Sequence, residues 1–447
     1  MKNKRIHLIG IGGVSMSSIA LLLKSLGNEV TGSDQAESPI IDNLRKNNIN
    51  VFIGTNKNII KDTDIVIYTM AIDQNNEELL EAKKLNKIIY SRPEFIHELS
   101  KNYKNVLCIS GTHGKSTTTG MTSKVFLDCG LNPTIMVGAY LKDIDGYLHI
   151  GKEDYLILET CEYKDAFLSF LPTTSVILNI DDDHLDYFKN LDNIKKSFQK
   201  FADLTKDYII LNNDDDNSKD IKHDKIITYG INNPSNIEAR NIKKDQMGHP
   251  IFDVYYNNEY LTTINLNVFG THNIYNSLAT IAFSIIYNLD ITKVTNSLNT
   301  YSGVKRRFEF IGTYNNAYLI DDYAHHPTEI KSTLESSKQV NANKTIAVFQ
   351  AHTYSRTKEH LKEFANVLAK FDEVIIAPIF PAREENIYNI HESDLVDLIK
   401  KENPNVIYLD SFSKIEDYLK THIEPNNLVI SIGAGPINKV MEGIKEC

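Results

Sequence analysis

The chain of 447 residues contains only four cysteines, Cys108, Cys129, Cys161 and Cys447, and no two of them form a CxxC pair. No Cys/His cluster has the spacing of a zinc finger either, so the sequence predicts neither a structural zinc site nor a disulfide framework. A reducing compartment suits this cysteine usage best, and we therefore expect a cytoplasmic protein.

The sequence also lacks a long apolar run and a long basic run. The stretch IHLIGIGGVSMSSIALLL follows a basic start and superficially resembles a signal peptide. Its glycines divide it into a strand, a turn and a helix, and Lys24 ends it too early to span a bilayer. We interpret it as folded structure and expect no membrane insertion. With 48 Lys+Arg against 58 Asp+Glu, a nucleic-acid partner is not expected.

What is present is the pattern of a large α/β protein. At roughly 150 residues per domain, the length predicts about three domains. A short apolar strand, a turn of small residues and a helical pattern occur three times, beginning at RIHLIGIGG, NVLCISGTHGKS and AYLIDDYAHH. The predicted domains are a Rossmann-like domain over 1–103, a central P-loop ATPase-type α/β domain over 104–309, and a Rossmann-like domain over 310–447.

The segment VLCISGTHGKSTTTGM has the pattern of a phosphate-binding loop. Glycines allow backbone N–H groups to approach phosphate oxygens, the helix N-terminus favours negative charge, and Lys115 adds a positive charge. Ile109 occupies the position where the longer GxxxxGK[ST] pattern has glycine. A plain strand-to-helix turn with an incidental lysine is the alternative. The predicted ATP-binding residues of this loop are Gly111, Thr112, His113, Gly114, Lys115, Ser116 and Thr117.

Two further strands end in residues that can hold a metal ion. Glu159 ends the apolar strand of YLILETCEY, and His184 follows the apolar strand before DDDHLDYF. Ligands of parallel α/β sheets gather at the carboxyl ends of the strands, so both residues are expected near Lys115. Together with the Ser116 hydroxyl they form a candidate Mg²⁺ site. Taken alone, an acidic segment of this kind is more often a solvated loop than a metal site.

The first glycine motif, LIGIGGVSMSS, places Gly10, Gly12 and Gly13 after a strand, with Ser15 where a third glycine is usual. Asp34 ends the next strand, at the distance where an acidic residue contacts a ribose in dinucleotide-binding folds. By itself this motif fits a nicotinamide cofactor, which would make the chain an oxidoreductase.

In their order along the chain, GTHGKST, ETCEYKDAFL, DDDHLDYF, FGTHNIYNSLAT and GVKRRFE resemble the Mur ligase family. The resemblance implies ATP on the 111–117 loop and Mg²⁺ on Ser116, Glu159 and His184. It also implies Asn273 and Asn276 beside the nucleotide base, although an N-cap is the alternative for Asn273. It further implies Arg307 on the triphosphate and Asp322 near the ATP ribose.

The same resemblance implies that the first domain holds a UDP group, through Gly10, Gly12, Gly13, Ser15 and Asp34. The family's uridine-contacting segment usually reads SSAI, whereas residues 69–72 here read TMAI. HHPTE and VFQAHTYSRTK are similar to the alanine-adding branch, which implies amino-acid binding by His325, His352 and Arg356. Gln199 occupies the position of the carbamylated lysine found in sister ligases, so no such lysine is expected.

The implied function is an ATP-dependent ligase that joins L-alanine to the carboxylate of UDP-N-acetylmuramate through an acyl phosphate, in peptidoglycan precursor synthesis. The implied catalytic residues are Lys115, His184 and Arg307, and a monomer or homodimer is expected. Three alternatives stay open: a recycling ligase that attaches a preformed peptide, the nicotinamide-dependent oxidoreductase, and a nucleotide-binding regulatory module that hydrolyses ATP slowly.

Overall fold

The computed structural model describes residues 2–245, 248–382 and 384–446, so that Cys447 lies outside the described residues. The chain forms two compact units. Unit 1 comprises Met1–Glu238, Tyr255–Tyr260 and Tyr275–Ser297, and unit 2 comprises Ala239–Val254, Leu261–Ile274 and Leu298–Cys447. Over the described part of the chain, no helix is long and apolar enough to cross a membrane.

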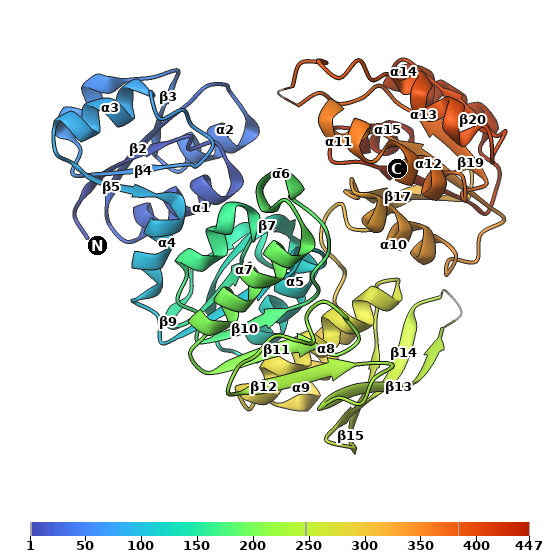
Figure 1. Ribbon diagram of the computed structural model, residues 1–447, viewed down its shortest axis with the longest axis horizontal. Coiled ribbons are helices and arrows are strands. Elements are labelled where there is room, and N and C mark those ends of the chain that lie inside the picture. The colour runs from blue at the N-terminus through green and yellow to red at the C-terminus, as the bar shows by residue number, and fades with distance from the viewer. Residues whose placement is uncertain (1, 246–247, 383, 447) are drawn as a thin grey trace. The chain divides into compact units, whose positions relative to one another are not determined.

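The first sheet of unit 1 is parallel throughout and has the order β3-β2-β1-β4-β5. Figure 1 shows its strands with the helices of the same segment beside them. The strands are β1 (Arg5–Ile9), β2 (Glu29–Asp34), β3 (Asn50–Ile53), β4 (Ile65–Tyr68) and β5 (Ile88–Ser91). The helices are α1 (Val14–Ser25), α2 (Pro39–Lys46), η1 (Lys57–Asp62), α3 (Glu77–Lys84) and α4 (Arg92–Ser100).

The second sheet of unit 1 contains strands in the order β12-β11-β10-β6-β9-β7-β8, and only the pairing of β8 with β7 is antiparallel among these strands. The strands are β6 (Asn105–Ser110), β7 (Pro133–Leu141), β8 (Gly146–His149), β9 (Lys152–Glu159), β10 (Thr174–Ile177), β11 (Tyr208–Asn212) and β12 (Ile226–Gly230). Between them lie α5 (Lys115–Asp128), η2 (Lys142–Ile144), η3 (Tyr163–Ser169), α6 (Leu185–Phe188) and α7 (Leu191–Leu204).

The neighbouring strands β10, β6 and β9 matter most for the site, because their carboxyl ends lie at one edge of the sheet. Beyond β12 the chain continues through β13 (Ile237–Lys244), β14 (Pro250–Tyr256), β15 (Glu259–Asn265), α8 (Thr271–Ile286) and α9 (Ile291–Asn299).

The third sheet lies in unit 2 and has the order β16-β17-β21-β18-β19-β20, with an antiparallel edge strand β16 and parallel neighbours otherwise. The strands are β16 (Glu309–Tyr314), β17 (Ala317–Asp322), β18 (Lys344–Phe349), β19 (Glu373–Ile376), β20 (Val406–Tyr408) and β21 (Asn427–Ile432). The helices are α10 (Pro327–Ser337), α11 (Tyr354–Glu359), α12 (Leu361–Leu368), α13 (Glu392–Ile399), α14 (Phe412–His422) and α15 (Asn438–Ile444).

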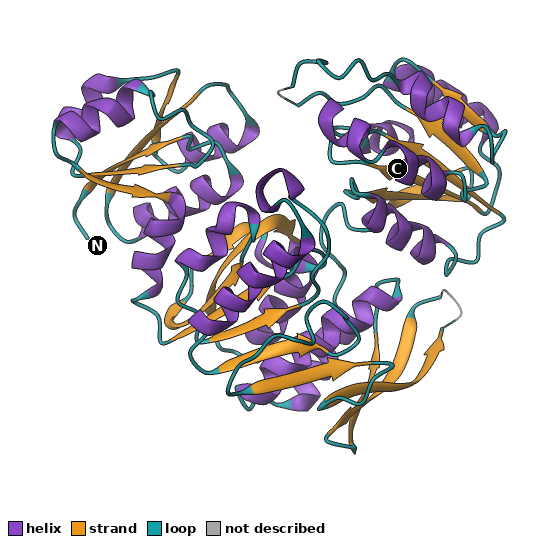
Figure 2. Cartoon of the chain, in the orientation of Figure 1, coloured by secondary structure: helices purple, strands orange, loops and turns teal. Residues whose placement is uncertain are grey.

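Both faces of the third sheet are buried. Successive residues of a strand point to opposite faces, and here Ile320, Phe349 and Ile376 belong to one apolar cluster. Their neighbours Leu319 and Val348 belong to the cluster on the other face. The strands are therefore apolar at consecutive positions, which is the pattern of a parallel sheet covered by helices on both sides. Helices and strands alternate along the chain as this architecture requires (Figure 2).

The predicted fold is confirmed: the chain is a three-domain α/β protein, and each of the three strand-turn-helix motifs contains an interior strand of a different sheet, namely β1, β6 and β17. The domain boundaries at 103/104 and 309/310 stay predictions.

One buried polar cluster lies between the first sheet and α3. The side chains of His7 on β1 and Glu78 on α3 are fully buried, with 3.4 Å between Nε2 and Oε1. Ser33 donates its hydroxyl to Glu78 Oε2 at 2.6 Å, and the Asn56 backbone N–H donates to Oε1 at 2.7 Å. Glu78 thereby connects two strands and a loop across one face of the sheet.

We expect Glu78→Ala to lower the free energy of unfolding of this segment by about 3–5 kcal/mol, because breaking a buried pair leaves its partners without an acceptor. Glu77→Ala, which removes an exposed neighbour on the same helix, should cost less than about 1 kcal/mol. Urea denaturation of the two variants measures the difference. Equal midpoints would show that the cluster contributes no stability.

Candidate active site

The loop between β6 and α5 has the backbone of a phosphate-binding turn. Gly114 is the N-cap of α5 and has φ = 83°, and Gly111 has φ = 136°. A Cβ at Gly111 would lie 3.0 Å from the Leu178 Cβ, and one at Gly114 would lie 2.8 Å from Asn276 Oδ1. Only glycine fits both positions. The loop thus directs the N-terminus of a 14-residue helix at the edge of the sheet, which favours an anion there.

Asn179, which follows β10, fixes this loop. Its side-chain oxygen accepts from the His113 backbone N–H at 2.8 Å, and its amide nitrogen donates to the His113 carbonyl at 3.1 Å. The Asp181 backbone N–H donates to the Thr112 hydroxyl at 2.9 Å. His113 also lies 3.3 Å from the Asp181 carboxylate and, with burial opposing, holds the pKa of that carboxyl below its usual range. The loop is therefore held before any ligand binds to it.

The ammonium of Lys115 lies inside the loop. It donates to the carbonyls of Gly111 and Thr112 at 2.6 and 2.9 Å and lies 3.2 Å from Glu162 Oε2. Burial lowers the pKa of Lys115, but the neighbouring acidic groups, with Glu162 foremost and Cys161 and Glu159 beside it, together outweigh burial and raise the pKa to about 12. Lys115 is consequently charged at neutral pH. The Glu162 side chain is only 2% exposed.

Ser116 and Glu159 form the second element of the site. The Ser116 hydroxyl donates to Glu159 Oε1 at 3.1 Å, and the Gly138 backbone N–H donates to Oε2 at 2.9 Å. The predicted proximity of the loop serine and the strand-end glutamate is confirmed. Such a hydroxyl and carboxylate are oxygen ligands of the kind that Mg²⁺ prefers.

His184, the third predicted metal ligand, has left-handed backbone with φ = 55° and its ring lies 4.6 Å from the ring of Tyr163. The described ion-pair partner of its imidazole is Asp183, with 3.7 Å between Nε2 and Oδ2, and not Glu159. Within the described residues no group of three His, Cys, Asp or Glu side chains could hold a metal ion. A metal ion at this position would need oxygen atoms of a bound nucleotide in addition to the protein side chains. Metal binding by Ser116, Glu159 and His184 stays a prediction.

The two predicted asparagines differ in their contacts. Asn276 Oδ1 accepts from the Thr118 hydroxyl on α5 at 3.1 Å, so that this asparagine lies against the phosphate-binding loop. Asn273 lies in the first turn of α8 and donates its side-chain amide to the Phe269 carbonyl at 2.7 Å. Asn276 therefore supports the loop whether or not it also contacts a base.

The first glycine turn also brings its predicted residues together. The Gly12 backbone N–H donates to Asp34 Oδ2 at 2.8 Å, and a Cβ at Gly12 would meet that oxygen at 2.8 Å. A Cβ at Gly10 would clash with the Thr69 methyl group. The 69–72 segment is thus in contact with the turn, and Ser15 lies in the first turn of α1.

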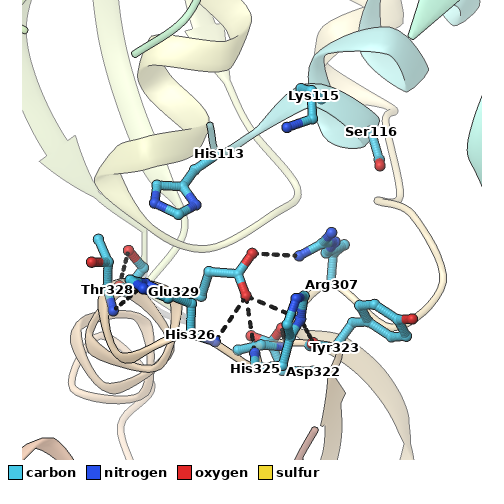
Figure 3. Close-up of polar contacts among 12 residues, drawn as sticks. His113, Lys115, Ser116, Arg307, Asp322, Tyr323, His325, His326, Thr328 and Glu329 are labelled. Carbon is cyan, nitrogen blue, oxygen red and sulfur yellow. Dashed lines mark hydrogen bonds and ion pairs between the residues drawn. The ribbon is translucent and has the colours of Figure 1, made fainter. Parts of the chain in front are cut away.

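In unit 2, Glu329 joins several of the predicted residues (Figure 3). Its Oε1 lies 3.6 Å from Arg307 Nη1, and its Oε2 accepts the His325 backbone N–H at 2.9 Å. Glu329 also completes a capping box with His326 at the start of α10. The guanidinium carbon of Arg307 lies 5.5 Å from the centre of the Tyr323 ring. Adjacent Arg306 instead bonds Asp321 and two carbonyls near the end of β21.

Asp322 ends β17 beside this cluster and is 8% exposed. Its Oδ2 accepts from the Thr333 hydroxyl at 2.7 Å, and its Oδ1 accepts from the Ala324 N–H at 3.1 Å. Burial raises the pKa of Asp322 to about 6, although Arg307 opposes the shift.

The remaining predicted residues of unit 2 lie around α11. Arg356 Nη1 donates to His352 Nδ1 at 3.2 Å, and the His352 ring lies 6.0 Å from the ring of His325. Burial and the neighbouring Arg356 lower the pKa of His352 to about 4, so its imidazole is neutral at pH 7. A guanidinium and a neutral imidazole together suit a small zwitterion such as an amino acid.

Sequence reasoning missed Asn179, Glu162 and Glu329. Glu329 had a signal, since it stands three residues after His326 in HHPTE, where a capping-box glutamate is expected. Asn179 and Glu162 had none, because each acts through a contact formed only when separate strands pair.

For Asp322 the raised pKa has a consequence for stability. The folded chain holds this proton up to about pH 6, whereas an aspartate in the unfolded chain has an ordinary pKa of 3.8. Stability from this group is therefore present below about pH 4 and is lost as the pH rises through 6. The difference between the free energy of unfolding of Asp322→Asn and that of the wild type should therefore shift by about 3 kcal/mol in favour of the variant between pH 4 and pH 7. Urea denaturation at several pH values measures this gain. A difference independent of pH would contradict the assignment, and Asp62→Asn, at an exposed aspartate, is the control.

Comparison with known families gives three matches in chain order. Residues 5–104 match the model described as Mur ligase family, catalytic domain, residues 109–284 match the Mur ligase middle domain, and residues 306–435 match the Mur ligase, glutamate ligase domain.

Individual proteins agree with these models. A UDP-N-acetylmuramate–L-alanine ligase of Caldicellulosiruptor bescii is 45% identical over 97% of this chain and 96% of the relative. The crystal structure of a UDP-N-acetylmuramate-alanine ligase from Thermotoga maritima matches with a TM-score of 0.85 and 27% identity, covering 99% of this chain and 98% of that one. A murein peptide ligase from Psychrobacter arcticus has the same fold, with a TM-score of 0.72, 23% identity and coverage of 99% and 98%.

The family models cover most of the chain in the order of its three sheets, and the relatives match over nearly its full length. The chain therefore belongs to the Mur ligase family.

Proposed function

We propose that this chain is an ATP-dependent ligase that joins L-alanine to the carboxylate of UDP-N-acetylmuramate in peptidoglycan precursor synthesis. The observation that carries the proposal is the loop of Lys115 and Ser116 set against Glu159, in a chain whose 45% identical relative is named for this reaction. ATP supplies the phosphoryl group, and ADP and phosphate are released.

The first step brings two anions together, since the substrate carboxylate attacks the γ-phosphate. At about 4 Å and an effective dielectric near 20, each pair of unit charges repels by about 4 kcal/mol, or roughly a thousandfold in rate. Lys115 provides a buried positive charge at the loop, and the helix start adds a partial one. Arg307 is the candidate for a second full charge on the transferring phosphoryl group.

Mg²⁺ fits the oxygen ligands present. Ser116 and Glu159 would hold it, with His184 as the third protein ligand, and the ion would neutralise phosphate charge as in other phosphoryl transfers. Gly138 keeps Glu159 oriented through its backbone N–H, so the carboxylate is in place before the ion binds.

The second step requires an amine that attacks the acyl phosphate. Arg356 would hold the carboxylate of L-alanine, and neutral His352, whose Nδ1 accepts from Arg356 and whose Nε2 therefore carries the ring proton, can donate a hydrogen bond to the same carboxylate. Asp322, with a pKa of about 6, is ionised at neutral pH and can take up the proton released by the attacking amine.

The alternatives explain less of the molecule. An oxidoreductase leaves Lys115, Glu159 and Arg307 without a role. A regulatory ATPase leaves the Arg356–His352 pair unexplained. A recycling ligase would use the same nucleotide sites, but it needs room for a peptide, and the murein peptide ligase is less similar in fold than the alanine ligase.

The test is phosphate release from ATP with Mg²⁺ and UDP-N-acetylmuramate, with L-alanine, other amino acids or a tripeptide as acceptor, followed by product mass. We expect release to depend on L-alanine and the product to gain one alanyl residue. Phosphate release that does not depend on the acceptor would contradict the assignment as a ligase.

Lys115→Ala should reduce kcat by about a thousandfold or more, because it deletes one of the charges that offset the repulsion. Lys124→Ala is the matched control, since Lys124 is a lysine of similar burial on the same helix and pairs with Asp128 and Asp143, away from the loop. Circular dichroism establishes that both variants fold. Near-normal turnover of folded Lys115→Ala would exclude the proposed role.

Glu159→Gln should raise the Mg²⁺ concentration needed for half-maximal activity by at least about tenfold, since an amide is a weaker ligand than a carboxylate. Glu153→Gln, near the start of β9, provides the comparison. A Mg²⁺ titration identical to that of the wild type would show that Glu159 does not bind the metal.

A further inference from the structure

Arg92 is the first residue of α4 and directs its side chain towards the first glycine turn. Its Nη1 donates to the hydroxyl of Ser15 at 3.1 Å. Ser15 lies in the first turn of α1, whose N-cap is Gly13. The guanidinium is therefore located at the start of α1, 77 positions away in the sequence.

No carboxylate of the described residues lies within ion-pair distance of Arg92. The contrast with other arginines is clear: Arg45 lies 2.7 Å from Glu37, and Arg306 lies 2.9 Å from Asp321. The group with which Arg92 has an electrostatic interaction is the thiol of Cys161. Burial raises the pKa of that thiol, so the thiol is neutral and does not balance the guanidinium.

Burial lowers the pKa of Arg92, yet arginine remains charged at physiological pH. A guanidinium carries five N–H donors, and the hydroxyl of Ser15 accepts only one of them here. Placing a positive charge in a part-buried position without a counter-ion costs stability. The arrangement is therefore one that an anion would complete.

Folding of α4 does not require the guanidinium. The helix start is already stabilised by a capping box in which Ser91 and Glu94 bond each other's backbone, and Pro93 follows in the first turn. These contacts use neither the side chain of Arg92 nor its charge. A role in binding explains the residue better than a role in the helix.

We propose that Arg92 binds the diphosphate of the UDP substrate, and that Ser15 orients it. The inference rests on the proposed function and adds a residue to its nucleotide-sugar site. Arginine's planar fork matches two phosphate oxygens. Because Ser15 accepts from Arg92, its own hydroxyl proton is left to donate to the same phosphate. The first turn of α1 contains no acidic residue that would oppose the anion.

Binding of UDP, uridine and UDP-N-acetylmuramate to the full chain tests this by calorimetry or competition. Arg92→Ala should weaken the binding of UDP and of UDP-N-acetylmuramate by roughly ten- to a hundredfold and leave the binding of uridine unchanged, because the variant loses only the contact with the diphosphate. Arg92→Lys should restore part of the affinity. Arg45→Ala, which removes an arginine already paired on α2, should bind like the wild type. In turnover, the KM for UDP-N-acetylmuramate should rise while that for ATP stays constant.

Equal weakening of uridine and UDP would show a structural role and overturn the proposal. Weakening of UDP-N-acetylmuramate alone would place the guanidinium on the sugar's carboxylate, which also overturns it. Normal affinity of Arg92→Ala for all three ligands would do the same. If the wild type binds UDP in the expected pattern but does not add alanine, the proposed function fails while the diphosphate assignment stands.

Discussion

The hydrogen bonds between Asn179 and His113 hold the phosphate-binding loop to the end of the neighbouring strand, and the rest of the site in unit 1 depends on them. With the loop fixed, the Lys115 ammonium is enclosed by the loop carbonyls of Gly111 and Thr112 and by Glu162. The Ser116 hydroxyl donates to Glu159. A flexible loop could not keep an ammonium ion charged in a buried place. The side chains of the site can therefore act only because the backbone of the loop is held rigid.

Carboxylates organise the positive groups in both units. Glu162 keeps Lys115 charged, and Glu329 lies between Arg307 and the backbone of His325. Arg92 differs, because no described carboxylate accompanies it. This difference suits the ligands: phosphates that react need strong charges already oriented by the protein, whereas a diphosphate that only anchors the substrate can itself act as the counter-ion.

The sequence predicted the fold and the individual motifs well, because strand-turn-helix patterns and glycine turns are local. It also predicted that Glu159 lies near Ser116, since Glu159 ends β9 and the loop that leads to Ser116 follows the neighbouring parallel strand β6. It did not predict Asn179, Glu162 or Arg92. Asn179 stands two residues before the DDDHLDYF segment, but nothing local distinguishes it from a surface asparagine. Its role arises from the pairing of β10 with β6, which no periodicity reveals.

The central claim is that the carboxylate of the nucleotide sugar is activated as an acyl phosphate at this loop. Turnover of UDP-N-acetylmuramate labelled with ¹⁸O in its carboxylate, with L-alanine and ATP, tests this most directly. The phosphate released should carry one ¹⁸O atom from the substrate in every turnover, seen by mass or by ³¹P resonance shift. Phosphate without the label, formed together with the alanyl product, would contradict the account.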